Sequence, residues 1–241
     1  MGSRVAAIGR QAIVAAVPVR AVVFDVDFTI ARPGPDLGPE GYRRLGERFG
    51  LALDPTRYER ARAAALAELE RHPELDHDEE IWILFTQRII EGMGGIGGRT
   101  YDAAVAMERA WLHAHHFELY DDVLPTLDAL RERGVKIGLL SNSARDLSEF
   151  VAHHGLQVDA VLTSRTHGKT KPHETIFRQI LALLDVPAEE ALMVGDTLED
   201  DVEGARAVGM QAVLVDREGR RGLADALDDL RAVVALLGVR G

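Results

Sequence analysis

The 241-residue chain has no cysteine, no long apolar run and a shortage of basic residues. The absence of cysteine excludes disulfides, a thiolate nucleophile and cysteine-ligated zinc or iron–sulfur centres. No apolar run approaches the roughly 20 residues that a membrane-spanning helix needs. Asp and Glu number 39 against 28 Lys and Arg, and a net charge of -11 repels phosphate backbones and anionic lipid surfaces. We therefore expect neither nucleic acid nor membrane as a partner, although a local site can still bind a small anion.

The first 19 residues differ from the rest of the chain. They include a short apolar stretch, Ala12 to Val19, that is faintly similar to a signal peptide. Pro18 interrupts this stretch, which runs directly into the first predicted strand, so cleavage there would cut the core. We interpret residues 1–19 as an N-terminal extension and expect a cytoplasmic protein.

Short apolar runs alternate with helical patterns and predict a parallel sheet in an α/β fold. Near-continuous apolar runs are typical of strands covered on both faces. The predicted strands are Ala21–Phe24, Val135–Leu140, Ala191–Val194 and Ala212–Val215, with a weaker one at Ala160–Leu162. The predicted helices of this part are Val123–Arg133, Ala144–His153, Glu174–Leu184, Asp200–Val208 and Leu223–Leu237.

About ninety residues between the first strand and the later alternation carry no comparable strand signal. Their apolar spacing instead predicts helices at Pro39–Phe49, Pro55–Arg71, Asp78–Gly92 and Thr100–His115. The sequence therefore predicts residues 33–117 as an all-helical second unit, inserted into a core formed by residues 20–32 and 118–241.

Polar residues follow the predicted strands at the points where the strands end. In open α/β sheets, ligands gather at the carboxyl ends of the strands, so residues far apart in sequence meet there. These residues are Asp25 and Asp27 after the first strand, Ser141 and Asn142 after Val135–Leu140, and Asp196 after Ala191–Val194. Lys171, which precedes Pro172 and a helical stretch, can enter from the same side.

These residue types suit phosphoryl transfer. The carboxylate of Asp25 can attack phosphorus and form an aspartyl-phosphate, which divides hydrolysis into two steps. Asp196 would bind a metal ion, and Asp201 would be a further ligand or would support one. Oxygen ligands and the absence of cysteine favour Mg²⁺, which offsets the repulsion between the attacking anion and an anionic substrate.

The remaining residues supply positioning and proton transfer. Ser141 Oγ and the backbone N–H of Asn142 would hold phosphoryl oxygens, and Lys171 would balance the charge that develops. Asp27 would protonate the leaving alkoxide and later deprotonate water. Each feature also has an ordinary explanation: acids begin turns and helices, Ser and Asn are common in loops, and Lys169 competes with Lys171.

The order of these motifs resembles the haloacid dehalogenase superfamily, most of whose members are phosphatases. The resemblance covers nearly the whole chain from Arg20 onward and rests on four segments: Val22–Thr29, Leu140–Asn142, Lys171–Phe177 and Val194–Ala205. It implies a Rossmann-like core and a helical cap over the substrate, with the roles assigned above. It also implies that the Asp27 backbone carbonyl is a ligand of Mg²⁺.

One residue departs from the family pattern. The family usually has glycine after its second aspartate, whereas this chain has Phe28, whose bulk and restricted backbone can alter the turn toward the cap. Asp27 itself argues against the dehalogenase branch, which typically lacks this second acid.

The leading hypothesis is a Mg²⁺-dependent phosphatase acting on a small phosphorylated metabolite. A phosphomutase shares the aspartyl-phosphate, and a binding or regulatory protein would keep the fold while Phe28 impairs catalysis. The sequence indicates neither the natural substrate nor the oligomeric state.

Residues of the cap are candidates for specificity, although surface charge or helix packing is the favoured explanation for each of them. They are Arg43, Arg44, Trp82, Gln87 and Arg88. His113, His115 and His116 suggest metal binding, but their position beside Phe117 favours packing where the cap rejoins the core.

Overall fold

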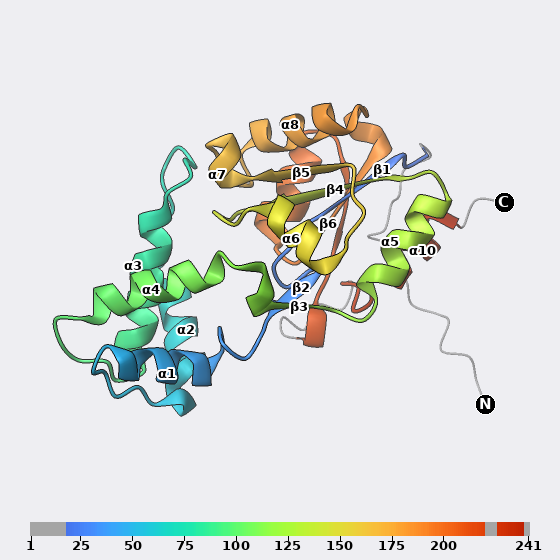
Figure 1. Ribbon diagram of the computed structural model, residues 1–241. Helices are drawn as coiled ribbons and strands as arrows, with labels where there is room; N and C mark the ends of the chain where they lie inside the picture. The colour runs from blue at the N-terminus through green and yellow to red at the C-terminus, as the bar shows by residue number, and fades with distance from the viewer. Residues whose placement is uncertain (1–17, 220–225, 239–241) are drawn as a thin grey trace, which may run out of the picture.

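The structure, a computed structural model, describes residues 18–219 and 226–238 and is built around a parallel sheet. The five strands lie in the order β5-β4-β1-β6-β7, and every neighbouring pair is parallel. Their bounds are Ala21–Phe24 (β1), Lys136–Ser141 (β4), Ala160–Thr163 (β5), Ala191–Gly195 (β6) and Gln211–Leu214 (β7). The predicted α/β sheet is therefore confirmed (Figure 1). Most of the predicted N-terminal extension lies outside the described residues.

Strand β1 lies in the middle of the sheet and is buried on both faces. Val22 and Phe24 pack into one apolar cluster, and Ala21 and Val23 into the other, as the alternation of side chains along a strand requires. Neighbouring strands hold its backbone on both edges, so Asp25, the residue that follows it, leaves the sheet from its central strand.

Helices cover both faces of the sheet (Figure 1). Apolar side chains of α5 (Val123–Glu132), α6 (Leu147–His154) and α10 (Arg231–Gly238) join the Val22 cluster, whereas those of α8 (Glu174–Leu184) and α9 (Gly204–Ala207) join the Val23 cluster. A further short helix, α7 (Ser164–His167), follows β5. The described part of the predicted Leu223–Leu237 helix is helical only from Arg231, and residues 220–225 lie outside the described ranges.

Helix α6 begins later than predicted. Asp146, rather than a residue before Ala144, caps it: its side chain accepts hydrogen bonds from the backbone N–H groups of Ser148 (2.8 Å) and Glu149 (3.4 Å). Arg145 therefore lies in the loop between β4 and α6.

The insertion forms a helical unit, residues 39–116, beside the sheet (Figure 1). Its elements are α1 (Pro39–Arg48), the 3-10 turn Pro55–Arg57, α2 (Tyr58–Ala67), α3 (Glu79–Gly92), α4 (Thr100–Trp111) and the 3-10 turn Ala114–His116. The predicted helix Pro55–Arg71 thus divides and ends four residues early, and the predicted helix Thr100–His115 ends at Trp111. The apolar cluster of the sheet continues into this unit through Ile30, Tyr42 and Met107.

A short antiparallel ribbon, absent from the sequence prediction, lies where the chain enters and leaves the helical unit. Strand β2 (Ala31–Pro33) pairs with β3 (Phe117–Leu119). Three residues are too few for an alternating pattern to stand out, and Pro33 argues against a strand. The ribbon ties together two segments that are more than eighty residues apart in sequence.

The predicted helix Asp200–Val208 is divided into a π-helical turn, Leu198–Glu203, and the short α9. The backbone N–H groups of Asp201 and Val202 both donate to the Thr197 carbonyl, at 3.0 and 3.4 Å. Such widened turns are frequent at functional sites. No helix within residues 18–219 and 226–238 combines the length and apolarity needed to cross a bilayer.

Candidate active site

Lys171 lies at the centre of a buried cluster at the carboxyl end of the sheet. Its ammonium donates to Asp25 Oδ1 and Asp201 Oδ1, both at 2.6 Å, and to the Leu140 carbonyl at 3.2 Å. The side chains of Lys171, Asp25 and Asp201 are 2%, 9% and 1% exposed. Residues from β1, β4, the segment before α8 and the turn after β6 therefore meet here, as the strand ends predict.

Asp196 completes a group of carboxylates. Asp25, Asp196 and Asp201 each offer an oxygen, and the three oxygens lie within 4.8 Å of one another. Gly195 makes this approach possible, since a Cβ atom there would lie 2.2 Å from the Asp201 carboxyl carbon. One ammonium balances only part of the charge of three carboxylates, so the donor set fits an additional cation.

The pKa shifts within the cluster also favour an additional cation. Burial raises the pKa of Asp25 well above its ordinary value; Lys171 lowers it, and the Asp201 and Asp196 carboxylates raise it further. Burial alone would lower the pKa of Lys171, but the Asp201 and Asp25 carboxylates outweigh burial and the net direction is upward. Lys171 therefore keeps its charge, and a bound cation would favour ionised Asp25.

Asn142 fixes the backbone of Lys171. Its side-chain oxygen accepts from the Lys171 N–H at 2.7 Å, and its amide nitrogen donates to the Lys171 carbonyl at 3.0 Å. Ser141, 2% exposed, donates from Oγ to Ser143 Oγ at 3.1 Å. The competing candidate Lys169 lies outside the cluster, since it pairs with Asp76 at 2.7 Å and with the Glu74 carbonyl.

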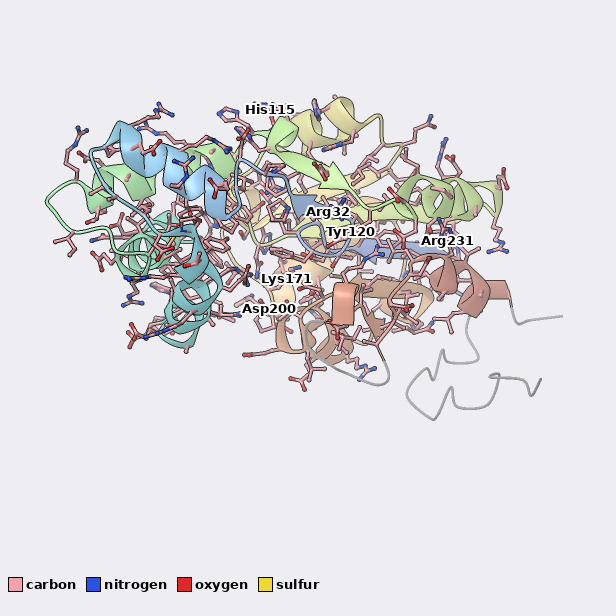
Figure 2. The ribbon with its side chains drawn as sticks, turned by 90° about the horizontal axis from the view of Figure 1, so that it is seen from below. Arg32, His115, Tyr120, Lys171, Asp200 and Arg231 are labelled. Carbon is pink, nitrogen blue, oxygen red and sulfur yellow. The ribbon has the colours of Figure 1, made fainter. Side chains whose placement is uncertain are left out.

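An arginine of the helical unit reaches the edge of this site. Arg71 forms a two-point ion pair with Asp200, and Asp200 also accepts from Asn142 Nδ2 at 3.4 Å. Lys171 and Asp200 lie where the helical unit meets the core (Figure 2). Arg71 was not predicted as a site residue, because it is the last residue of the predicted helix Pro55–Arg71 and has no motif around it.

Asp27 does not join the carboxylate cluster. Its two side-chain oxygens accept from Arg145 Nη1 at 2.9 Å and Nη2 at 3.3 Å. Arg145 was missed as well, because an arginine four residues after Ser141 reads as an exposed helical residue. Because Asp146 caps α6, Arg145 lies in the loop before the helix, and its side chain turns inward from there.

Phe28 adopts the left-handed backbone conformation, with φ of 65°. This is the region that glycine enters without a steric cost, which explains the glycine usual at this position in the family that the motifs resemble. The Phe28 ring lies 5.4 Å from the Arg62 guanidinium of α2, so it faces the helical unit.

The other candidates of the helical unit are engaged in local contacts. Arg43, for example, pairs with Glu40 and Glu47 of its own helix, and Arg88 donates to the Glu68 carbonyl. His113 stacks on His115, and the His116 ring lies tilted against both. Among the described residues, the group of three acidic or histidine side chains placed to hold a metal ion is the Asp25 cluster. These contacts favour a packing role for these arginines and histidines over substrate recognition or metal binding.

Comparison with known proteins assigns the chain to a family. Residues 19–209 match the haloacid dehalogenase-like hydrolases. The chain belongs to this family. Among curated relatives of this hydrolase, a ribulose-1,5-bisphosphate 5-phosphatase from Halopiger xanaduensis is 34% identical over 203 residues, 81% of this chain and 84% of that protein. A phosphoserine phosphatase from Thermus thermophilus is 35% identical over 154 residues, 61% of each chain.

A solved structure gives the same assignment. The hydrolase resembles a HAD phosphatase from Thermococcus onnurineus, with a TM-score of 0.63 and 30% identity over 91% of this chain and 98% of that one. Sequence and structure together identify the chain as a phosphatase of the haloacid dehalogenase superfamily.

Proposed function

We propose that this phosphatase hydrolyses small phosphorylated metabolites, with Mg²⁺, through an aspartyl-phosphate on Asp25. The observation that carries the proposal is the buried bridge from Lys171 to Asp25 and Asp201, with the Asp196 carboxylate in reach. A nucleophile, a fixed cation and a set of hard oxygen ligands occupy one place at the end of the sheet.

The residues present suit magnesium. Asp196, Asp201 and Asp25 would hold the ion through carboxylate oxygens, together with the Asp27 backbone carbonyl. When bound, the ion would offset the negative charge of carboxylates and phosphoryl group and would favour ionised Asp25.

The protein groups then perform two displacements. Asp25 attacks phosphorus, the bond to the leaving oxygen breaks, and Asp27 gives that oxygen its proton. A water molecule next attacks phosphorus, Asp27 takes its proton, and phosphate leaves as the Asp25 carboxylate is restored. Ser141 Oγ and the Asn142 N–H hold phosphoryl oxygens, while Lys171 stabilises the charge that builds on them.

The helical unit acts as a cap, residues 33–117, on a core of residues 20–32 and 118–241. The β2–β3 ribbon supports these boundaries, because it pairs Ala31–Pro33 with Phe117–Leu119 at the two crossings between the parts. The cap also contacts the core through backbone hydrogen bonds from His77 to Gly168 (2.9 Å) and from Thr170 to Leu75 (2.8 Å). Such a cap encloses the substrate and limits its size.

The relatives support the substrate class. Their names describe phosphatases acting on ribulose 1,5-bisphosphate and phosphoserine, which are both small phosphorylated metabolites. The two substrates differ from each other, so the class alone transfers to this chain.

A panel of phosphorylated metabolites tests the proposal. Wild-type protein is expected to release phosphate from at least one of them with Mg²⁺ and not with EDTA, and Asp25→Asn is expected to abolish release. Lys171→Ala is expected to lower release strongly, whereas Lys169→Ala, whose side chain lies outside the cluster, is the matched control and is expected to retain turnover. Conversion of a sugar phosphate to its isomer without phosphate release would indicate a phosphomutase. No turnover on any compound would favour a binding protein.

A further inference from the structure

Arg145 is a buried arginine that binds the side chain of Asp27 with a two-point ion pair. Its Nη1 and Nη2 groups donate to Oδ1 at 2.9 Å and Oδ2 at 3.3 Å. The Arg145 side chain is 2% exposed, whereas that of Asp27 is 24% exposed. The arginine therefore lies behind the carboxylate and cannot itself reach a substrate.

The surroundings of Arg145 fix the plane of its guanidinium. Nε donates to the Trp111 carbonyl at 3.1 Å. The guanidinium carbon lies 3.6 Å from the centre of the Phe117 ring and 5.6 Å from that of Phe150. A guanidinium held by hydrogen bonds in its plane and by rings across its face has a single orientation, which it imposes on the bound carboxylate.

These contacts join Asp27 to the place where the helical unit ends. Trp111 is the last residue of α4, Phe117 the first of β3, and Phe150 belongs to α6 of the core. One side chain thus connects the proposed acid–base residue with both parts of the molecule.

We propose that Arg145 is a positioning residue that aims Asp27 at the leaving-group oxygen, an inference that rests on the proposed function. The shorter contact, from Nη1 to Oδ1, anchors the carboxylate, and Oδ2, which is held at the longer distance, is the oxygen that would exchange a proton with the substrate. In the first displacement the proton moves from Oδ2 to the leaving oxygen as its bond to phosphorus breaks. In the second it returns from the attacking water to Oδ2.

The dependence on leaving group tests this role. An alkyl leaving group needs a proton as it departs, whereas p-nitrophenolate leaves readily without one. We would measure kcat/KM, which reports the steps up to departure, for p-nitrophenyl phosphate and for an alkyl phosphomonoester that the wild-type enzyme hydrolyses. Arg145→Met is expected to lower the alkyl value on the order of 100-fold and the aryl value much less, because misplacement of a reacting group has about this cost. Guanidinium ion is expected to restore part of the alkyl activity.

Arg145→Lys keeps the positive charge but loses the planar pair of N–H donors. It is therefore expected to lower the ratio of kcat/KM for the alkyl substrate to kcat/KM for the aryl substrate, as Arg145→Met does, but by a smaller factor. If Arg145→Met does not fold, Arg145→Lys is measured in its place. In an Asp27→Asn background, neither substitution at Arg145 should change the ratio further. A further change there would show that Arg145 does not act through Asp27.

Arg217 provides the matched control. It is also a buried arginine, 7% exposed, with two contacts to one aspartate, Asp122 (2.6 and 3.0 Å), and an aromatic ring, Tyr120, at 4.3 Å. Arg217→Lys is expected to lower the melting temperature and to affect both substrates equally. Equal losses on both substrates in the Arg145 variants would overturn the inference. Undiminished turnover in both Asp25→Asn and Asp27→Asn would instead overturn the proposed function itself.

Discussion

At the scale of single residues, Phe28 combines an unfavourable backbone conformation with a ring that contacts the helical unit. Its φ of 65° disfavours any side chain with a Cβ atom, while the ring interacts with Arg62. We expect Phe28→Gly to be more stable than Phe28→Ala by about 1 kcal/mol, because both lose the ring but only alanine keeps the strain. Urea denaturation of the two variants measures this difference. Equal stabilities would mean that the backbone at position 28 is not strained in solution.

The carboxylate cluster leads to a prediction that does not depend on turnover. Mg²⁺ is expected to stabilise the folded protein by about 2.7 kcal/mol at one hundred times its dissociation constant, since the proposed function has it bind the native cluster and not the unfolded chain. Asp196→Asn removes a charged ligand and should abolish most of this gain. Thermal unfolding with and without Mg²⁺ provides the measurement, and Asp185→Asn, on the exposed end of α8, is the matched control. An unchanged gain in Asp196→Asn would remove Asp196 from the metal site.

At the scale of elements, the contact between α3 and α4 contains a buried acid. Glu108 of α4 accepts a hydrogen bond from the Thr86 hydroxyl of α3. Burial raises the pKa of Glu108 from 4.5 to about 7, and the bond from Thr86 opposes this only in part. The folded protein therefore binds a proton that the unfolded chain has already lost between these two pH values.

The sign of the resulting pH dependence follows by linkage. The contribution of Glu108 to the free energy of unfolding is fully present below pH 4.5 and is lost as the pH rises through about 7. Glu108→Gln cannot ionise, so its stability relative to wild type should rise across this window by up to about 3 kcal/mol. Urea denaturation at several pH values measures the difference between the two proteins. A difference in stability that stays constant with pH would show that folding does not raise the pKa of Glu108.

The elements also show where the sequence was informative. The strands with continuous apolar runs were predicted correctly because burial on both faces leaves a strong signal, as at Val22 and Val23. The carboxyl ends of those strands then placed Asp25 and Asp196 together without knowledge of side-chain positions, and Lys171 was predicted to enter from the same side before the helix that follows Pro172. Strands β2 and β3 left no such signal, because pairing between distant segments, not local pattern, defines them.

At the scale of the whole molecule, the unpredicted part of the site consists of arginines. Arg145 and Arg71 both bind aspartates that lie more than one hundred residues away in sequence. Arginine is normally exposed, so neither its burial nor its partner can be read from local sequence. The proposed division into core and cap, and the proposed role of the cap in selecting substrate, depend in the same way on how distant segments pack.

The proposed cap meets the core at Arg71 and Asp200, beside the carboxylate cluster, and the proposed chemistry begins at Asp25 of that cluster. The measurement is mass spectrometry of the peptide containing Asp25 after the enzyme has been mixed with Mg²⁺ and a turned-over phosphomonoester and quenched rapidly in acid. The account predicts a phosphoryl group on Asp25 that appears before free phosphate and is absent from Asp25→Asn. Turnover by the wild-type enzyme with no phosphoryl group on Asp25 at any time, or with Asp25→Asn still active, would contradict it.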